Sequence, residues 1–177
     1  MPVYKKQLRL PHSEYIGRRA YFVTVCTEDR ATYFSDPATG RWLLEKLIAT
    51  AAGSTFALHA YCAMPDHVHF VCEGLTDTCN LIKFVEGFKQ RSAYEFSKTQ
   101  HHRLWQRRYY DHILRPSDAI EEVACYIWWN PVRKGLCVDP HQYSLSGSQT
   151  LDWMKHSSLA PQWQPPWKLV EAGLQPG

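Results

Sequence analysis

The chain has 177 residues, of which 45% are hydrophobic and 21% charged, a composition typical of one folded domain or of one domain with a tail. No apolar run reaches the roughly 18 residues that a membrane-spanning helix needs, and the first residues lack the apolar stretch of a secretory signal. These features argue against a membrane protein, a coiled coil or collagen. We expect a soluble, cytoplasmic protein whose six cysteines are reduced.

Charge is unevenly distributed along the chain. Twenty Lys and Arg residues stand against 17 Asp and Glu residues, and the net charge of +3 neither requires a polyanionic partner nor excludes one. Two basic clusters stand out, Lys5, Lys6, Arg9, Arg18 and Arg19 near the start, and Arg103, Arg107 and Arg108 further on. Such a cluster is most often a solvated surface, so its position relative to a site decides its meaning.

The spacing of apolar and turn residues predicts seven elements. In chain order these are a strand at 20–27, a helix at 37–53, strands at 55–64 and 67–73, a helix at 78–98, a strand at 105–114 and a helix that closes near residue 130. The tight Pro65-Asp66 turn makes the two strands beside it antiparallel neighbours. Pro116-Ser117-Asp118 is expected to cap the last helix.

This order predicts an α+β fold. The first six elements are those of a ferredoxin-like antiparallel sheet, β-α-β-β-α-β, with helices on one face. The seventh element is an extra helix that carries Tyr126. After about Tyr143 the composition shifts to Ser, Gln, Pro and Trp. We therefore expect a domain at 1–146 and an irregular tail at 147–177 that docks through its tryptophans.

Two histidines alternate with apolar residues in the third predicted strand. Residues i and i+2 of a strand point to the same face, so His67 and His69 project side by side. Two imidazoles with an added oxygen ligand suit a catalytic divalent cation that holds phosphate oxygens. Taken alone, an H-x-H pattern is more often two ordinary exposed or core histidines.

The last predicted helix carries a tyrosine and an asparagine four residues apart. This spacing places Tyr126 and Asn130 on one side of the helix, at the border between its apolar stripe and water. Asn130 offers an oxygen ligand for the same cation. Pro131 biases Asn130 away from helical geometry, so the relation requires the helix to persist to its last residue.

Three motifs in this order resemble a known family. They are Pro65-Asp66-His67-Val68-His69, then Trp105-Gln106 with Tyr110-Asp111-His112, then Tyr126-Ile127-x-x-Asn130-Pro131-Val132. Together they are similar to the REP-associated tyrosine transposases of the HUH single-tyrosine superfamily, over about residues 21–146. The resemblance implies an endonuclease and strand transferase acting on single-stranded DNA. It also implies that Tyr126 forms a 5′-phosphotyrosine and that His67, His69 and Asn130 hold Mg²⁺ or Mn²⁺.

The resemblance also implies a DNA partner, a hairpin of a palindromic repeat with a short flanking tetranucleotide. Candidate phosphate contacts are Arg18, Arg19, Lys89, Arg91, Arg107 and Arg108. Tyr21, Trp105 and Tyr109 are candidates for stacking on unpaired bases. The family pattern favours a monomer and leaves a dimer open.

Two other functions stay open at this point. The first is a non-catalytic nucleic-acid-binding module on the same sheet, although the third strand presents histidines where such modules need aromatic residues. The second is a zinc hydrolase that uses Cys62, His67 and His69, although no glutamate nearby in sequence offers a general base.

Overall fold

The computed structural model describes residues 10–171. The basic residues Lys5, Lys6 and Arg9 and the end of the predicted tail lie outside this range. No helix within residues 10–171 combines the length and the apolar character needed to cross a bilayer.

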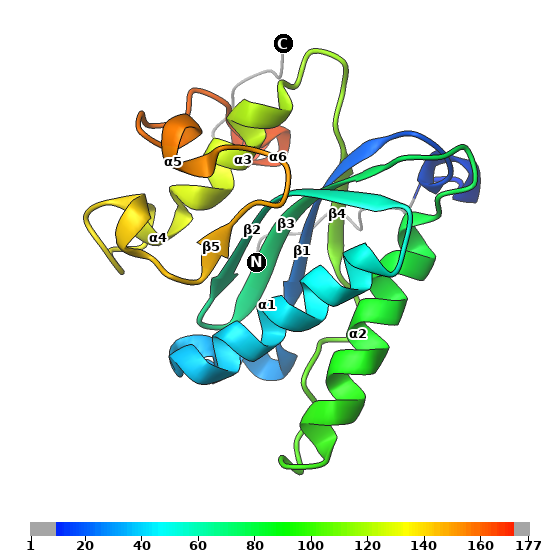
Figure 1. Ribbon diagram of the computed structural model, residues 1–177, viewed down its shortest axis with the longest axis vertical. Coiled ribbons are helices and arrows are strands. Elements are labelled where there is room, and N and C mark those ends of the chain that lie inside the picture. Colours follow the sequence, from blue (N-terminus) through cyan, green and yellow to red (C-terminus); the bar gives the residue numbers. More distant parts are fainter. Residues whose placement is uncertain (1–9, 172–177) are drawn as a thin grey trace.

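The centre of the protein is one antiparallel sheet with strand order β4-β1-β3-β2-β5 (Figure 1). Its strands are β1 (Ala20–Cys26), β2 (Phe56–Met64), β3 (His67–Gly74), β4 (Tyr110–Ile113) and β5 (Ser146–Gly147). The order of the first four strands is that of a ferredoxin-like sheet, which confirms the predicted fold class. β5 adds an edge strand that the sequence did not predict.

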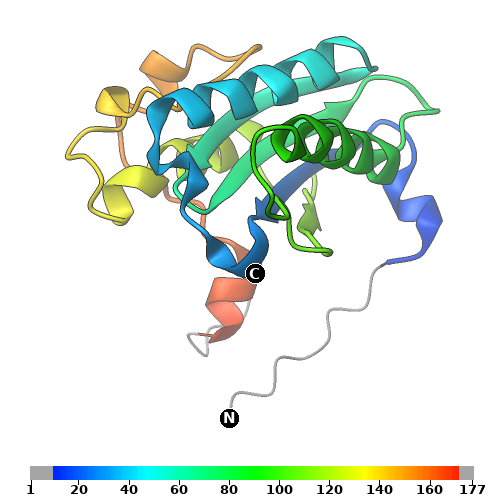
Figure 2. The ribbon, with the colours of Figure 1, turned by 90° about the horizontal axis from the view of Figure 1, so that it is seen from below.

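Two helices cover one face of the sheet, as Figure 2 shows. They are α1 (Pro37–Ala52) and α2 (Leu81–Ser97). Asp36 caps α1 by accepting hydrogen bonds from two backbone amides, and Asn80 caps α2 by accepting one from Lys83 N at 3.1 Å. The Asn80 cap places the start of α2 three residues later than predicted. Leu43, Leu47 and Phe88 are among the core residues of this layer.

The opposite face of the sheet is covered by α3 (Ile120–Trp128) and by the tail. Residues 123–128 of α3 are all buried, because the sheet covers one side of this helix and tail residues cover the other. Shorter elements complete the described part of the chain: α4 (Asn130–Arg133), α5 (Trp153–His156), α6 (Pro166–Glu171) and 3₁₀ turns at His12–Tyr15, Glu28–Arg30, Tyr33–Ser35 and Pro140–Gln142.

The end of α3 differs from the prediction. The helix stops at Trp128, and Asn130 begins the separate turn α4, so Tyr126 and Asn130 do not share one unbroken helix. Pro131 lacks the N–H that would bond to the carbonyl of Ile127, and this interrupts the helical ladder. The predicted cap is also wrong: α3 begins after Ala119 with no side-chain cap.

β4 is shorter than predicted and begins at Tyr110. Of the preceding segment, Trp105 forms one isolated bridge with Thr27. In the segment between Trp105 and Tyr110, the carbonyl oxygens of Gln106 and Arg107 accept hydrogen bonds from Lys89 of α2, at 2.9 and 3.0 Å. Because those carbonyls turn towards α2, the segment leaves the ladder.

The tail is more ordered than predicted. β5 straddles the predicted boundary at residues 146 and 147, and α5 and α6 follow it. Trp153, Trp163 and Trp167 pack against the α3 side of the sheet, which places the tail on the face that carries the histidines. The division into 1–146 and 147–177 stays a prediction.

Candidate active site

The two histidines of β3 point at each other. Their Nε2 atoms lie 2.9 Å apart. Asp66 accepts a hydrogen bond from His67 Nδ1 at 2.5 Å, and the Thr24 hydroxyl lies 2.7 Å from His69 Nδ1. Each ring is therefore fixed from behind through Nδ1. For His67, this bond also leaves the Nε2 lone pair available as a ligand.

Both imidazoles are held in the neutral form. Burial lowers the pKa of His67, against the opposing effect of its hydrogen bond to Asp66. For His69, burial and then the charges of His67 and Arg133 bring the pKa well below its usual range. A neutral imidazole is the form that binds a metal ion.

The histidine pair fits a metal centre. Two nitrogen ligands about 2.1 Å from one ion and at right angles are about 3 Å apart, close to the separation observed between the two Nε2 atoms. Within residues 10–171, no third His, Cys, Asp or Glu side chain completes such a group. A further ligand must then be of another type, such as the amide oxygen of Asn130, water or a substrate oxygen.

Tyr126 lies on the same side of the sheet as the histidines and is buried, with 5% of its surface exposed. Phe22 of β1 lies close to both groups. Its ring centroid is 6.3 Å from that of Tyr126 and 5.4 Å from that of His69. The structure thus brings His67, His69 and Tyr126 to one face of the sheet, where the Phe22 ring contacts both the tyrosine and His69.

Asn130 is buried at the first position of α4. In the described part of the chain, no hydrogen bond joins its side chain to either histidine. Its role as a ligand stays a prediction.

Two cations that the sequence analysis did not select flank Tyr126. The Arg133 guanidinium lies 3.9 Å from the centroid of the Tyr126 ring, and Lys168 Nζ lies 5.4 Å from it. Arg133 is three residues beyond Asn130 in the third motif, so proximity in sequence was an available signal. Lys168 belongs to α6 in the tail, and only the folded chain brings it to Tyr126.

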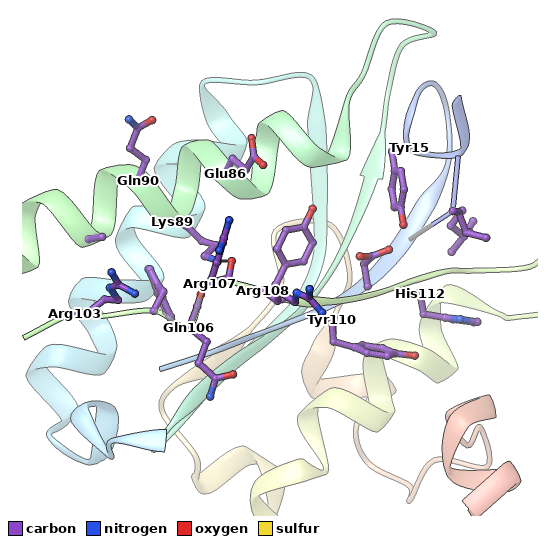
Figure 3. A pocket seen from close by; sticks show the side chains of 16 residues that line it. Tyr15, Glu86, Lys89, Gln90, Arg103, Gln106, Arg107, Arg108, Tyr110 and His112 are labelled. Carbon is purple, nitrogen blue, oxygen red and sulfur yellow. Dashed lines mark hydrogen bonds between the residues drawn. The ribbon is translucent and has the colours of Figure 1, made fainter. Parts of the chain in front are cut away.

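Tail aromatic residues and β4 complete this face. The Trp163 ring is 5.2 Å from that of Tyr126, and its Nε1 donates to Asp118 at 3.1 Å. Trp167 lies 4.5 Å from Tyr110 and 5.4 Å from His112. Tyr110 and His112 project from β4 on the side away from α2 (Figure 3). Tyr110 and His112 of the second motif therefore share the histidine face, whereas Trp105 packs on the α2 side.

Five of the six predicted DNA contacts line two grooves that both include residues of β4. One groove, of about 1850 Å³, is lined by Lys89, Arg107 and Arg108 together with Arg103 (Figure 3). The other groove, of about 580 Å³, is lined by Arg18 and Arg19 together with Arg115. Arg91 is exposed on α2 and lines neither groove.

The basic residues differ in how free they are to bind phosphate. Arg107 and Arg108 are exposed. Arg18 pairs with Asp77 at 3.2 Å, and Arg19 pairs with Glu14 at 2.5 Å. Lys89 donates to two backbone carbonyls, so part of its role is structural.

The prediction of stacking on unpaired bases is wrong for two of the three residues. Tyr21 and Trp105 are buried in the core, so neither presents a ring to a base. Tyr21 faces the core from β1, and Trp105 packs against Phe34 and Phe88. Tyr109 is partly buried and lines the larger groove.

Cys62 does not suit a zinc centre. It is fully buried, and burial raises the pKa of its thiol to about 12. A zinc ligand must be a thiolate, which this environment opposes.

Comparisons with known proteins identify the family of the chain. The family model described as "Transposase IS200 like" matches residues 17–129, which is more than half of the chain and includes His67, His69 and Tyr126. The chain is similar to a protein of Haemophilus influenzae named as a REP-associated tyrosine transposase. The two are 27% identical over 127 residues, which cover 65% of this chain and 71% of that protein.

Two solved structures are similar in fold. One is a REP-associated tyrosine transposase bound to a REP hairpin, with a TM-score of 0.66 and 19% identity over 80% of this chain and 82% of that one. The other is a protein of Deinococcus radiodurans R1 described as a transposase, with a TM-score of 0.50 and 25% identity over 63% of this chain and 88% of that one. The sequence resemblance is thereby confirmed, and the chain belongs to the IS200-like transposase family and is an enzyme of the tyrosine transposase type.

Proposed function

We propose that this enzyme cleaves and rejoins single-stranded DNA that folds into hairpins of palindromic repeats, through a covalent bond between Tyr126 and a 5′-phosphate. The observation that carries the proposal is the arrangement on one sheet face. The Nε2 atoms of His67 and His69 meet at 2.9 Å, and the Phe22 ring contacts both His69 and Tyr126.

The proposed reaction exchanges one phosphate ester for another. Tyr126 Oη gives up its proton and bonds to phosphorus, the bond from phosphorus to the 3′ oxygen breaks, and that oxygen takes up a proton as a 3′-hydroxyl. Because the phosphotyrosine conserves the ester, a 3′-hydroxyl can later attack it and restore a continuous strand. His67, His69 and Asn130 are the proposed holders of Mg²⁺ or Mn²⁺, which supplies positive charge beside the phosphate oxygens.

The two grooves beside β4 are the proposed path of the DNA. Arg107 and Arg108 line one groove and Arg18 and Arg19 the other, so cations lie at both ends of the strand. Cations in a groove attract the phosphate backbone without reading its sequence. Lys89 and Arg91 are proposed as further contacts from α2. The hairpin bound in the similar transposase structure supports a hairpin as the partner.

One copy of the chain is the proposed working unit. His67, His69 and Tyr126 come from β3 and α3 of the same chain and reach the same face of its sheet. No second chain is needed to complete this set.

A single assay tests the proposal. The full chain is incubated with Mn²⁺ and a synthetic single-stranded hairpin oligonucleotide carrying unpaired flanks on both sides, and products are separated under denaturing conditions. Cleavage with a protein–DNA adduct that survives denaturation is expected. Cleavage without an adduct would mean hydrolysis, and binding without cleavage would mean a non-catalytic binding module. Either result contradicts the proposal.

A further inference from the structure

We propose that Arg133 holds the scissile phosphate against Tyr126, which makes it a catalytic residue of this site. This inference rests on the proposed function and adds the residue that positions the reacting group.

The first argument is the position of the guanidinium. It lies 3.9 Å from the centroid of the Tyr126 ring, and Nη2 donates a hydrogen bond to the backbone oxygen of Tyr126 at 2.7 Å. These two contacts fix Arg133 and Tyr126 relative to each other. A group that binds Arg133 is therefore held beside the phenol.

The second argument is that most of the binding capacity of the guanidinium remains available. A guanidinium has five N–H donors in a planar fork that matches two phosphate oxygens. Within residues 10–171, the Arg133 guanidinium makes one hydrogen bond and forms no ion pair with a carboxylate. The residue is exposed as a whole, so the proposed approach of the phosphate is from the solvent side of Arg133, next to the Tyr126 ring.

The third argument is the distribution of charge around Tyr126. Arg133 from α4 and Lys168 from α6 are the two cations over this ring. Lys168 is a point charge at 5.4 Å, whereas Arg133 touches the ring and can bind in bidentate geometry. Of the two, Arg133 is therefore the better candidate to bind a phosphate beside the Tyr126 ring.

The test measures whether Arg133 senses the charge of one phosphate. The cleavage position in the hairpin oligonucleotide is first mapped with the unmodified protein. The phosphate at that position is then replaced by an uncharged methylphosphonate. Binding of both oligonucleotides is measured for Tyr126→Phe, which keeps the ring under Arg133, and for Tyr126→Phe combined with Arg133→Gln.

Neutralising this phosphate is expected to weaken binding of the Tyr126→Phe protein about tenfold and to change binding of the double variant little. Equal weakening of both proteins would overturn the proposal and leave Arg133 a packing residue. A merely structural role would lower the melting temperature without producing this difference.

Adduct formation gives a second readout. Arg133→Gln is expected to slow it about 100-fold under single-turnover conditions, with partial recovery in Arg133→Lys. Arg41→Gln, on exposed α1 surface, is the matched control. Unchanged rates in Arg133→Gln would also overturn the proposal. If the unmodified chain forms no adduct, the proposed function itself fails, a result distinct from either outcome for Arg133.

Discussion

The imidazoles of His67 and His69 meet through their Nε2 atoms at 2.9 Å, while Asp66 and Thr24 hold their Nδ1 atoms. This relationship fixes both rings so that their Nε2 atoms, hydrogen-bonded to each other, face the same point. Outer partners of this kind orient a ligand and raise its basicity, and their loss typically costs about 10- to 100-fold in metal affinity.

Asp66→Asn is accordingly expected to weaken Mn²⁺ binding by about 10- to 100-fold, because an amide does not hold the His67 tautomer as a carboxylate does. The measurement is the Mn²⁺ concentration dependence of the melting temperature. Glu45→Gln, an exposed change on α1, serves as the control. Equal Mn²⁺ affinity in Asp66→Asn and the unmodified protein would show that the pair does not bind the ion as described.

Arg108 and Lys89 line the same groove but are expected to behave differently on substitution. Arg108→Gln should weaken hairpin binding and lower the slope of log affinity against log salt by about 1, because one phosphate contact is lost. Lys89→Met should also lower the melting temperature, since Lys89 anchors the carbonyls of Gln106 and Arg107. Binding titrations at several salt concentrations and thermal melts distinguish the two. A salt slope that Arg108→Gln leaves unchanged would remove Arg108 from the interface.

His112 is expected to make the fold sensitive to acid. Burial lowers its pKa in the folded protein, against the opposing charge of Asp118. The unfolded chain therefore binds a proton more readily, and the stability that neutral His112 contributes is lost as the pH falls below about 6.5. Denaturant titrations between pH 7.5 and 5 should show a smaller decline in unfolding free energy for His112→Asn than for the unmodified protein. Parallel declines would contradict this assignment.

Trp163 tests the docking of the tail. Its ring contacts Phe22 and Tyr126, and its Nε1 donates to Asp118. Trp163→Ala removes a large, partly buried ring and is expected to lower the free energy of unfolding by about 1–3 kcal/mol. Denaturant unfolding measures this, with Trp163→Phe expected to recover part of the loss. A free energy of unfolding that Trp163→Ala leaves unchanged would mean that the tail contributes nothing at this face.

Much of the sheet could be predicted because its signals are local. The run at 20–27 and the Pro65-Asp66 turn predict three strands whose observed ends lie within one residue of the prediction. Strand alternation likewise predicts that His67 and His69 share a face. β4, by contrast, is shorter than predicted. Before it, Lys89 of α2 bonds to the carbonyl oxygens of Gln106 and Arg107, which lie 17 and 18 positions further along the chain, so no local pattern encodes these contacts.

The parts of the site that were missed depend on tertiary contacts. The partnership of Thr24 with His69 follows from strand register, because these residues are opposed in the β1–β3 pairing. Lys168 reaches Tyr126 only because α6 folds back over the sheet. Tyr21 and Trp105 have aromatic rings that could stack on bases, but both are buried. Residue type alone does not determine which aromatic side chain faces the core.

The most direct test of the central claim is to identify the residue that carries the DNA. After reaction with the hairpin oligonucleotide and Mn²⁺, the adduct is digested with protease and nuclease, and the modified peptide is sequenced by mass spectrometry. The nucleotide is expected on Tyr126, and Tyr126→Phe is expected to form no adduct. Tyr94→Phe, which changes an exposed tyrosine of α2, is expected to react normally. An adduct on another residue, or one that persists in Tyr126→Phe, would contradict the account.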